Sequence, residues 1–143
     1  GPSAFCFHGV MAVKSIASVA MFVLASVSAG TAAHAAPDVA RGEQLYGRCA
    51  ACHALTYDRV GPRHCGLFGR RAGSVPGFDY SPAMKRSGIV WNDKTLDQFL
   101  TKPLAMVPAS SMTYAGVPLA SDRADLIAYL KSANGGPACS GAP

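Results

Sequence analysis

Five residues, Cys49-Ala50-Ala51-Cys52-His53, constrain this 143-residue chain more than any other feature. Cys-x-x-Cys-His is the attachment motif of c-type haem. Its two thiols can bond to the two vinyl groups of one porphyrin, and the adjacent histidine can reach the iron. A chain with this motif must fold around a large, flat, apolar group. The motif therefore predicts one covalent haem c, held by Cys49 and Cys52, with His53 as an axial ligand.

Two other interpretations of the cysteine pair are weaker. A thioredoxin-like redox pair belongs in a βαβ context, and no such pattern surrounds residues 49–53. A structural zinc site needs a second pair of ligands, but His64 and Cys65 are adjacent in the chain, which is poor spacing for a metal.

Residues 11–35 have the pattern of a secretory signal peptide. Lys14 supplies the charged start, residues 16–27 are apolar and small, and Ala33-His34-Ala35 is an A-x-A cleavage site. The alternative is a membrane anchor, but the apolar run is shorter than the roughly 18 residues that a spanning helix needs. We expect cleavage after about Ala35, a periplasmic location, and one mature domain over 36–143. Residues 1–10 precede Met11 and are interpreted as an upstream extension or added residues.

The mature domain has a mild basic balance. It contains twelve Lys and Arg against eight Asp and Glu, a formal net charge of +4. It lacks the basic runs that are typical of nucleic-acid binding. A mild positive charge is compatible with steering toward acidic protein partners.

Two cysteines remain once Cys6 and the two haem thiols are set aside: Cys65 and Cys139. Disulfides persist in an oxidising compartment, so export favours a bond between them. It would close a loop of roughly 75 residues and contribute on the order of 4 kcal/mol. Two free thiols remain the alternative, because sequence does not show whether the two Cα atoms come within bonding reach.

The periodicity predicts an all-α domain with long loops at 54–80 and 104–116. Its expected helices begin at capping residues and end near Gly or Pro: Asp38 to about Cys49, Ser81-Pro82 to Gly88, Asn92 to Pro103, and Ser121 to Asn134-Gly135-Gly136-Pro137. Gly42, in the first of them, would permit close approach of another helix.

The second axial ligand decides between a closed electron-transfer haem and an open, reactive one. The mature candidates are three methionines and one histidine: Met84, Met106, Met112 and His64. Met112 is favoured, because it lies in a loop of small residues that could pass close over a haem face. Met106 is the next candidate and His64 the remotest. Thioether ligation raises the reduction potential of a haem.

Several stretches of the mature domain resemble class I cytochrome c, the mitochondrial cytochrome c and bacterial cytochrome c2 group. They are residues 49–53, Gly61-Pro62, residues 66–70, Pro76-Gly77-Phe78, residues 88–91, Tyr114-Ala115-Gly116 and residues 125–131. The resemblance implies the small all-α cytochrome c fold, with crossed N- and C-terminal helices around one covalently bound haem.

The resemblance also implies roles for individual residues. The Pro62 carbonyl would orient the His53 ring, as partners of metal-bound histidines do. Arg70, Tyr80 and Trp91 would meet the haem propionates. Met112 falls where the family has its methionine ligand.

The chain departs from the family pattern at some positions. Phe99 replaces a tyrosine near the methionine sulfur, and Met84 replaces an asparagine near the propionates. Most of the lysines that ring the exposed haem edge in mitochondrial members are missing; Leu104, Ser111, Pro118 and Leu119 stand in their places, while Arg48 remains. Docking to partners should therefore depend less on salt.

The expected function is that of a monomeric periplasmic one-electron carrier, not an enzyme. Its iron would cycle between Fe(III) and Fe(II) under His/Met ligation. Expected partners are redox proteins: a quinol-oxidising complex or dehydrogenase as donor, and an oxidase, reductase or photosynthetic centre as acceptor, without nucleic acid or a stable membrane anchor. The alternatives are a dedicated electron-transfer subunit of one enzyme complex or, with less support, a haem peroxidase or gas sensor.

Overall fold

The computed structural model describes residues 35–142, so the upstream extension at 1–10 and the signal peptide at 11–35 fall outside it except for Ala35. The described part is helical, with one isolated antiparallel bridge between Arg71 and Val90. Its five helices, in chain order, are α1 (Val39–Tyr46), α2 (Pro82–Arg86), α3 (Asp93–Thr101), α4 (Pro103–Met106) and α5 (Ala120–Gly135). Within residues 35–142, none of the helices is long and apolar enough to cross a membrane.

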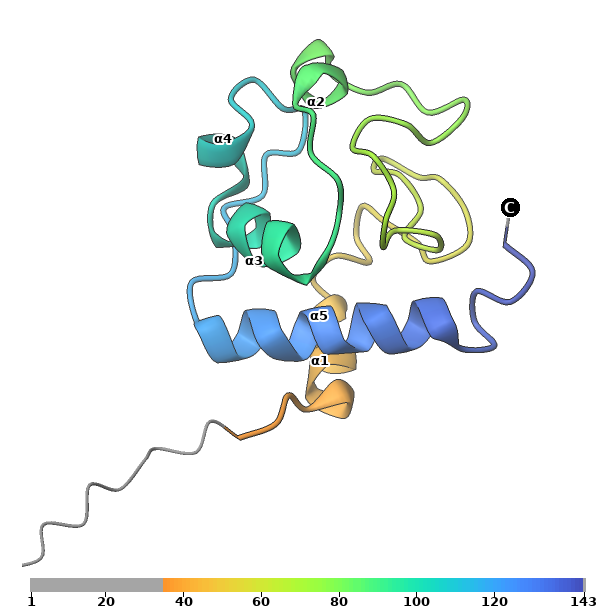
Figure 1. Cartoon of the computed structure of the whole chain (residues 1–143), viewed down its shortest axis with the longest axis vertical. Helices are drawn as coiled ribbons and strands as arrows, with labels where there is room; N and C mark the ends of the chain where they lie inside the picture. The colour runs from red at the N-terminus through yellow and green to blue at the C-terminus, as the bar shows by residue number, and fades with distance from the viewer. Residues whose placement is uncertain (1–34, 143) are drawn as a thin grey trace, which may run out of the picture. The chain divides into compact units, whose positions relative to one another are not determined.

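The first and last long helices, α1 and α5, cross in direct contact (Figure 1). Gly42 makes the crossing possible, as the sequence predicted. A Cβ atom on Gly42 would lie 2.0 Å from the Asp125 carbonyl oxygen and 2.8 Å from the Tyr129 Cβ. Only a residue without a side chain allows the two backbones to approach this closely.

Charged groups hold the same crossing together at its edge. Arg41 forms ion pairs with Asp122 at 2.6 Å and with Asp125 at 2.8 Å. The Asp38 backbone N–H donates to the Asp125 carboxylate at 2.7 Å. This backbone hydrogen bond, followed by the Arg41 side chain, lowers the pKa of Asp125 below its usual value. The start of α1 is therefore joined to α5 by an ionised carboxylate.

Three predicted helix starts are confirmed by their caps. The side chains of Asp38, Ser81 and Asn92 accept hydrogen bonds from backbone N–H groups in the first turns of α1, α2 and α3. Asn92 also forms a reciprocal capping box with Thr95, at 2.9 Å in each direction.

Two expectations about helix boundaries are wrong. The region 104–116 was expected to be loop throughout, but Pro103 opens the short helix α4; proline suits a first helical position, where its missing N–H is not needed. Ser121 was expected to cap the last helix, but α5 begins at Ala120 without a side-chain cap. The Arg123 guanidinium, in the first turn, ties the preceding segment to the helix by donating to the Val117 and Pro118 carbonyls at 2.9 and 3.0 Å.

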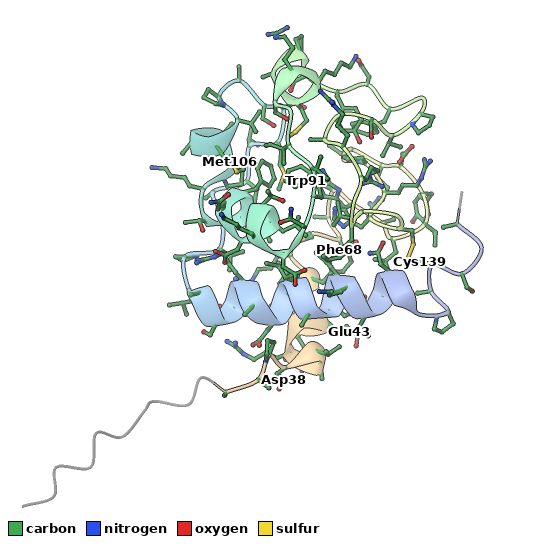
Figure 2. All side chains as sticks on the ribbon, in the orientation of Figure 1. Asp38, Glu43, Phe68, Trp91, Met106 and Cys139 are labelled. Atoms are coloured by element: carbon green, nitrogen blue, oxygen red, sulfur yellow. A yellow bond between two sulfur atoms is a disulfide. The ribbon has the colours of Figure 1, made fainter. Side chains whose placement is uncertain are left out.

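The loop over 54–80 has no regular secondary structure, as expected, and is fixed by contacts with the rest of the domain. Its Leu67 and Ala72 join the core around Trp91 and Leu126. Its Cys65 forms a disulfide with Cys139, with the two Cα atoms 5.3 Å apart. Figure 2 shows Cys139 just beyond the end of α5, beside the loop. The pair expected from the cysteine count is thus the pair that the structure joins.

Candidate functional site

The haem-attachment motif continues the turn that ends α1. The backbone N–H of Cys49 donates to the Tyr46 carbonyl at 2.8 Å, and the N–H groups of Cys52 and His53 donate to the Cys49 carbonyl at 3.0 and 2.8 Å. Helical spacing places residues i and i+3 on one side of such a turn. Both thiols are free, with Cys49 half-buried and Cys52 exposed. They therefore form a pair that one flat group could bridge.

The His53 ring is oriented by the segment that follows the motif. Its Nδ1 lies 2.7 Å from the Pro62 carbonyl oxygen, which requires the proton on Nδ1 and leaves Nε2 with a free lone pair. Burial lowers the pKa of His53, against the effect of the Pro62 hydrogen bond. A neutral imidazole is the form that binds a metal. Gly61 also lies against the ring: a Cβ there would be 2.2 Å from His53 Cε1.

Arg70 provides a test of whether the site fits a haem propionate. Its two terminal nitrogens donate to the Cys65 and Arg63 carbonyls at 3.0 and 2.8 Å. Its Nε is buried without a hydrogen-bond partner. An unpaired buried donor on a cation is costly, and burial lowers the pKa of Arg70. A carboxylate would satisfy both the donor and the charge, so the residue fits the group.

The other two residues expected near the propionates lie close to Arg70. The backbone N–H of Trp91 donates to the Arg70 carbonyl at 3.0 Å, and Tyr80 is near enough for its charge state to affect the pKa of Arg70. Trp91 is also a core residue, whose ring meets Phe99 edge-on at 5.0 Å. The structure therefore places Tyr80 and the Trp91 backbone near Arg70, while the Trp91 ring packs in the core.

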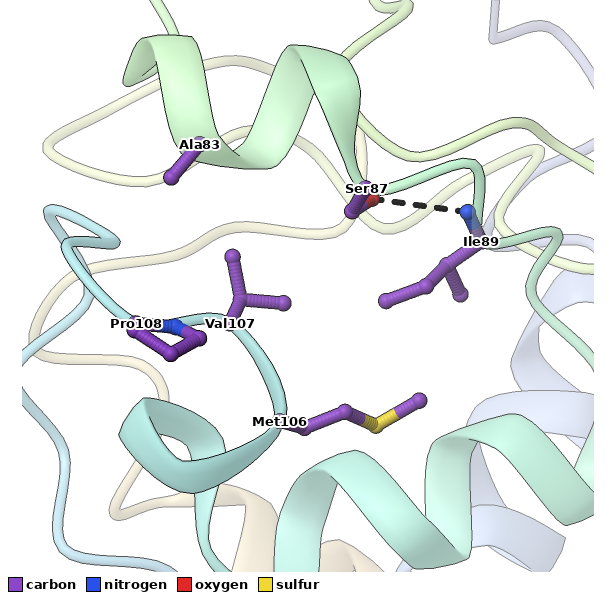
Figure 3. Close-up of a pocket in the computed structure, with 6 residues that line it drawn as sticks. All are labelled: Ala83, Ser87, Ile89, Met106, Val107 and Pro108. Carbon is purple, nitrogen blue, oxygen red and sulfur yellow. Dashed lines mark hydrogen bonds between the residues drawn. The ribbon is translucent and has the colours of Figure 1, made fainter.

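The three methionine candidates lie in different surroundings. Met84 is buried in the core, and Met106 lines an open hollow of about 330 Å³ between α2 and the segment after α4 (Figure 3). Neither His53 nor Met112 lines that hollow. Met112 is half-buried against the core, in a segment whose backbone bonds the Ser110 hydroxyl at 3.2 Å.

His64 plays a part that sequence reasoning did not identify. Its ring stacks on that of His53, with centroids 4.3 Å apart, and its Nδ1 lies 3.0 Å from the Tyr46 hydroxyl. Burial, followed by the charges of His53 and Arg70, lowers the pKa of His64 to about 3. A ring stacked beside one axial ligand is badly placed to bind the opposite face of the same haem. The sequence carried no signal for this contact, since no periodic pattern links residues 46, 53 and 64.

The two free thiols on one turn, the neutral His53 with its free Nε2 and the unpaired Nε of half-buried Arg70 fit a covalently attached haem. The sequence model described as "Cytochrome c" matches residues 39–134. The chain is 43% identical to a cytochrome c2 of Rhodomicrobium vannielii over 72% of this chain and 85% of that protein. It is 45% identical to a cytochrome c of Gibberella zeae over 66% of this chain and 92% of that protein.

A solved structure shares the fold as well. The cytochrome cH from Methylobacterium extorquens superposes with a TM-score of 0.64 at 38% identity, over 66% of this chain and 97% of that one. The chain belongs to the cytochrome c family. It accordingly binds one covalent haem c and acts as an electron carrier and not as an enzyme. The peroxidase alternative is not supported by these relatives, and the all-α cytochrome c fold is confirmed.

Proposed function

We propose that Cys49 and Cys52 form the thioether bonds to the haem and that His53 and Met112 are its two axial ligands. The observation that carries the proposal is the 2.7 Å contact between His53 Nδ1 and the Pro62 carbonyl, because it holds the ring in place and leaves Nε2 of a neutral imidazole free to bind a metal. Arg70, through its unpaired Nε, and Tyr80 and Trp91 beside it would receive the haem propionates.

The protein's own contribution to electron transfer is rigidity and the exclusion of water. The haem supplies a one-electron Fe(III)/Fe(II) couple. Pro62 holds the ring of one ligand in a single orientation, and the Ser110 hydroxyl bonds the backbone of the other. Buried Trp91 and Phe99 keep the interior apolar, which disfavours the more charged ferric site and raises the reduction potential.

Absorption spectroscopy of the haem-loaded protein tests the ligand assignment. A ferric band near 695 nm reports a bond between methionine sulfur and iron. The wild type and Met106→Leu should show the band, and Met112→Leu should lack it. A wild type without the band at neutral pH, or a band that survives Met112→Leu, would refute His53/Met112 ligation.

The pathway assignment we propose is that of a periplasmic shuttle, exported by residues 11–35 and cleaved after about Ala35. It would take electrons from a quinol-oxidising complex or dehydrogenase and deliver them to an oxidase, reductase or photosynthetic centre. N-terminal sequencing of the exported protein should begin near Ala36. Affinity capture from periplasm and membranes, with the haem-loaded protein as bait, would identify the donor and acceptor.

A dedicated subunit of one enzyme complex is the second candidate. It is favoured by two exposed leucines, Leu104 and Leu119, at 42% and 59% exposure, where the family resemblance would place lysines. An apolar surface of this kind suits a lasting protein interface. Gel filtration of native extract separates the two: a free shuttle elutes as a small monomer, and a subunit elutes with its complex.

A further inference from the structure

The ring of His53 has an aromatic neighbour that none of the assigned roles uses. The planes of His53 and His64 are inclined by only 21°, with centroids 4.3 Å apart, so the two rings are stacked. His64 is in turn held by Tyr46, whose hydroxyl lies 3.0 Å from Nδ1 and whose ring meets it edge-on at 5.7 Å. Because Tyr46 ends α1 and bonds the backbone of Cys49, this neighbour is connected to the attachment turn itself.

The backbone that carries His64 is fixed on both sides. Its own N–H donates to the Ala54 carbonyl at 3.1 Å. The carbonyls of the residues before and after it, Arg63 and Cys65, both accept from the Arg70 guanidinium. Cys65 is tied further by its disulfide. A side chain on such a backbone is pre-organised, as residues that support a functional ligand need to be.

The His53 ring is therefore restrained from three directions. Pro62 holds Nδ1 by a hydrogen bond, the Gly61 backbone lies against the Cε1 side, and His64 covers a ring face. We propose that His64 is a positioning residue, which, anchored by Tyr46, sets the rotation of the His53 imidazole about its bond to the haem iron. Rotation away from the observed plane would break the stacked contact, which aromatic pairs favour. The inference rests on the proposed ligation by His53.

The orientation of an axial imidazole can be read by NMR. In a low-spin ferric haem, unpaired spin is distributed over the porphyrin according to the plane of that imidazole, so the shifts of the haem methyl groups report the ring angle. The haem-loaded wild type would be compared with His64→Leu, which removes the stack and the hydrogen bond, and with His64→Phe, which keeps a flat ring. Tyr46→Phe removes only the anchoring hydroxyl. Tyr129→Phe is the matched control, since Tyr129 contacts the Tyr46 ring at 5.2 Å but is not a partner of His64.

We expect His64→Leu to change the pattern of haem methyl shifts, His64→Phe to restore most of it, Tyr46→Phe to change it to a smaller extent, and Tyr129→Phe to leave it unchanged. A wild-type pattern in His64→Leu, or no recovery in His64→Phe, would overturn the proposal. If His64→Leu does not take up haem, the Tyr46→Phe variant provides the test. An unchanged pattern of haem methyl shifts in Tyr46→Phe would then overturn the proposal. The 695 nm band is monitored in every sample, so that a failure of the positioning role can be distinguished from a failure of the ligand assignment. Absence of the band in the wild type would refute the ligand assignment.

Discussion

The crossing of α1 and α5 makes Gly42→Ala a demanding test of how tightly this domain is packed. The added methyl carbon would lie 2.0 Å from the Asp125 carbonyl oxygen, whereas ordinary contact begins at 3.4 Å. The helices must therefore separate by roughly 1 Å, and overpacking of this kind costs about 1–3 kcal/mol. The same separation would weaken the hydrogen bond from the Asp38 N–H and the ion pair of Arg41. Alanine's better helix propensity recovers only about 0.5–1 kcal/mol, so we expect a net loss of about 2 kcal/mol.

Guanidinium denaturation of the haem-loaded protein measures this loss. Trp91, the only tryptophan in the chain, is buried near the expected haem, which quenches its fluorescence. Unfolding separates the two groups, so the fluorescence of Trp91 should rise. A loss of about 2 kcal/mol lowers the midpoint by roughly half a molar in a domain of this size. Gly135→Ala, in the last turn of α5, is the matched control, because a Cβ there meets nothing within 4 Å. If Gly42→Ala lies within about 0.5 kcal/mol of the control, the helices are not held at the observed distance and the reasoning fails.

Three further perturbations address other parts of the molecule. Asp125→Asn should be less stable than wild type at neutral pH. Because the pKa of Asp125 is lowered in the folded protein, the difference in stability should shrink as the pH falls below about 4. A difference in melting temperature that does not change with pH would contradict this. Replacing both Cys65 and Cys139 by alanine should lower the free energy of unfolding by on the order of 4 kcal/mol, measured by denaturant titration without reductant. Addition of a reductant should destabilise the wild type and leave the double variant unchanged. Gly61→Ala would place a methyl 2.2 Å from the His53 ring, so its purified haem form should lose the low-spin absorption spectrum; a wild-type spectrum would show that the ring can move aside.

Apart from the Cys65–Cys139 pair and the close approach at Gly42, the parts of this structure that sequence predicted correctly are decided by neighbours in the chain. The caps at Asp38, Ser81 and Asn92 bond N–H groups three residues away, so a short window contains both partners. The haem motif is equally local, and the place of Pro62 beside His53, nine residues on, follows from the family resemblance and agrees with the 2.7 Å contact.

The parts that sequence missed depend on contacts between distant segments. Ser121 is an acceptable cap by composition, but α5 begins one residue earlier, at Ala120, without a side-chain cap. The Arg123 side chain in its first turn bonds the carbonyls of residues 117 and 118 and pairs with Asp97 at 2.7 Å. The stack of His64 on His53 depends on the path of a loop without periodicity. Neither contact leaves a pattern that a short window of sequence could reveal.

The disulfide imposes an order on how this protein can mature. Four cysteines of the described domain can pair completely in three ways, and all three consume both haem thiols. Two of them join Cys49 and Cys52 to Cys65 and Cys139, and the third joins Cys49 to Cys52 beside the observed Cys65–Cys139 bond. Cys139 follows Cys65 by 74 residues, so Cys65 must wait for the whole segment between them before its partner is available. After folding, Cys65 is 1% exposed and is shielded from exchange with other thiols. If the protein is exported to an oxidising compartment, as proposed, its maturation requires a reductant that keeps Cys49 and Cys52 as thiols while leaving the Cys65–Cys139 bond intact.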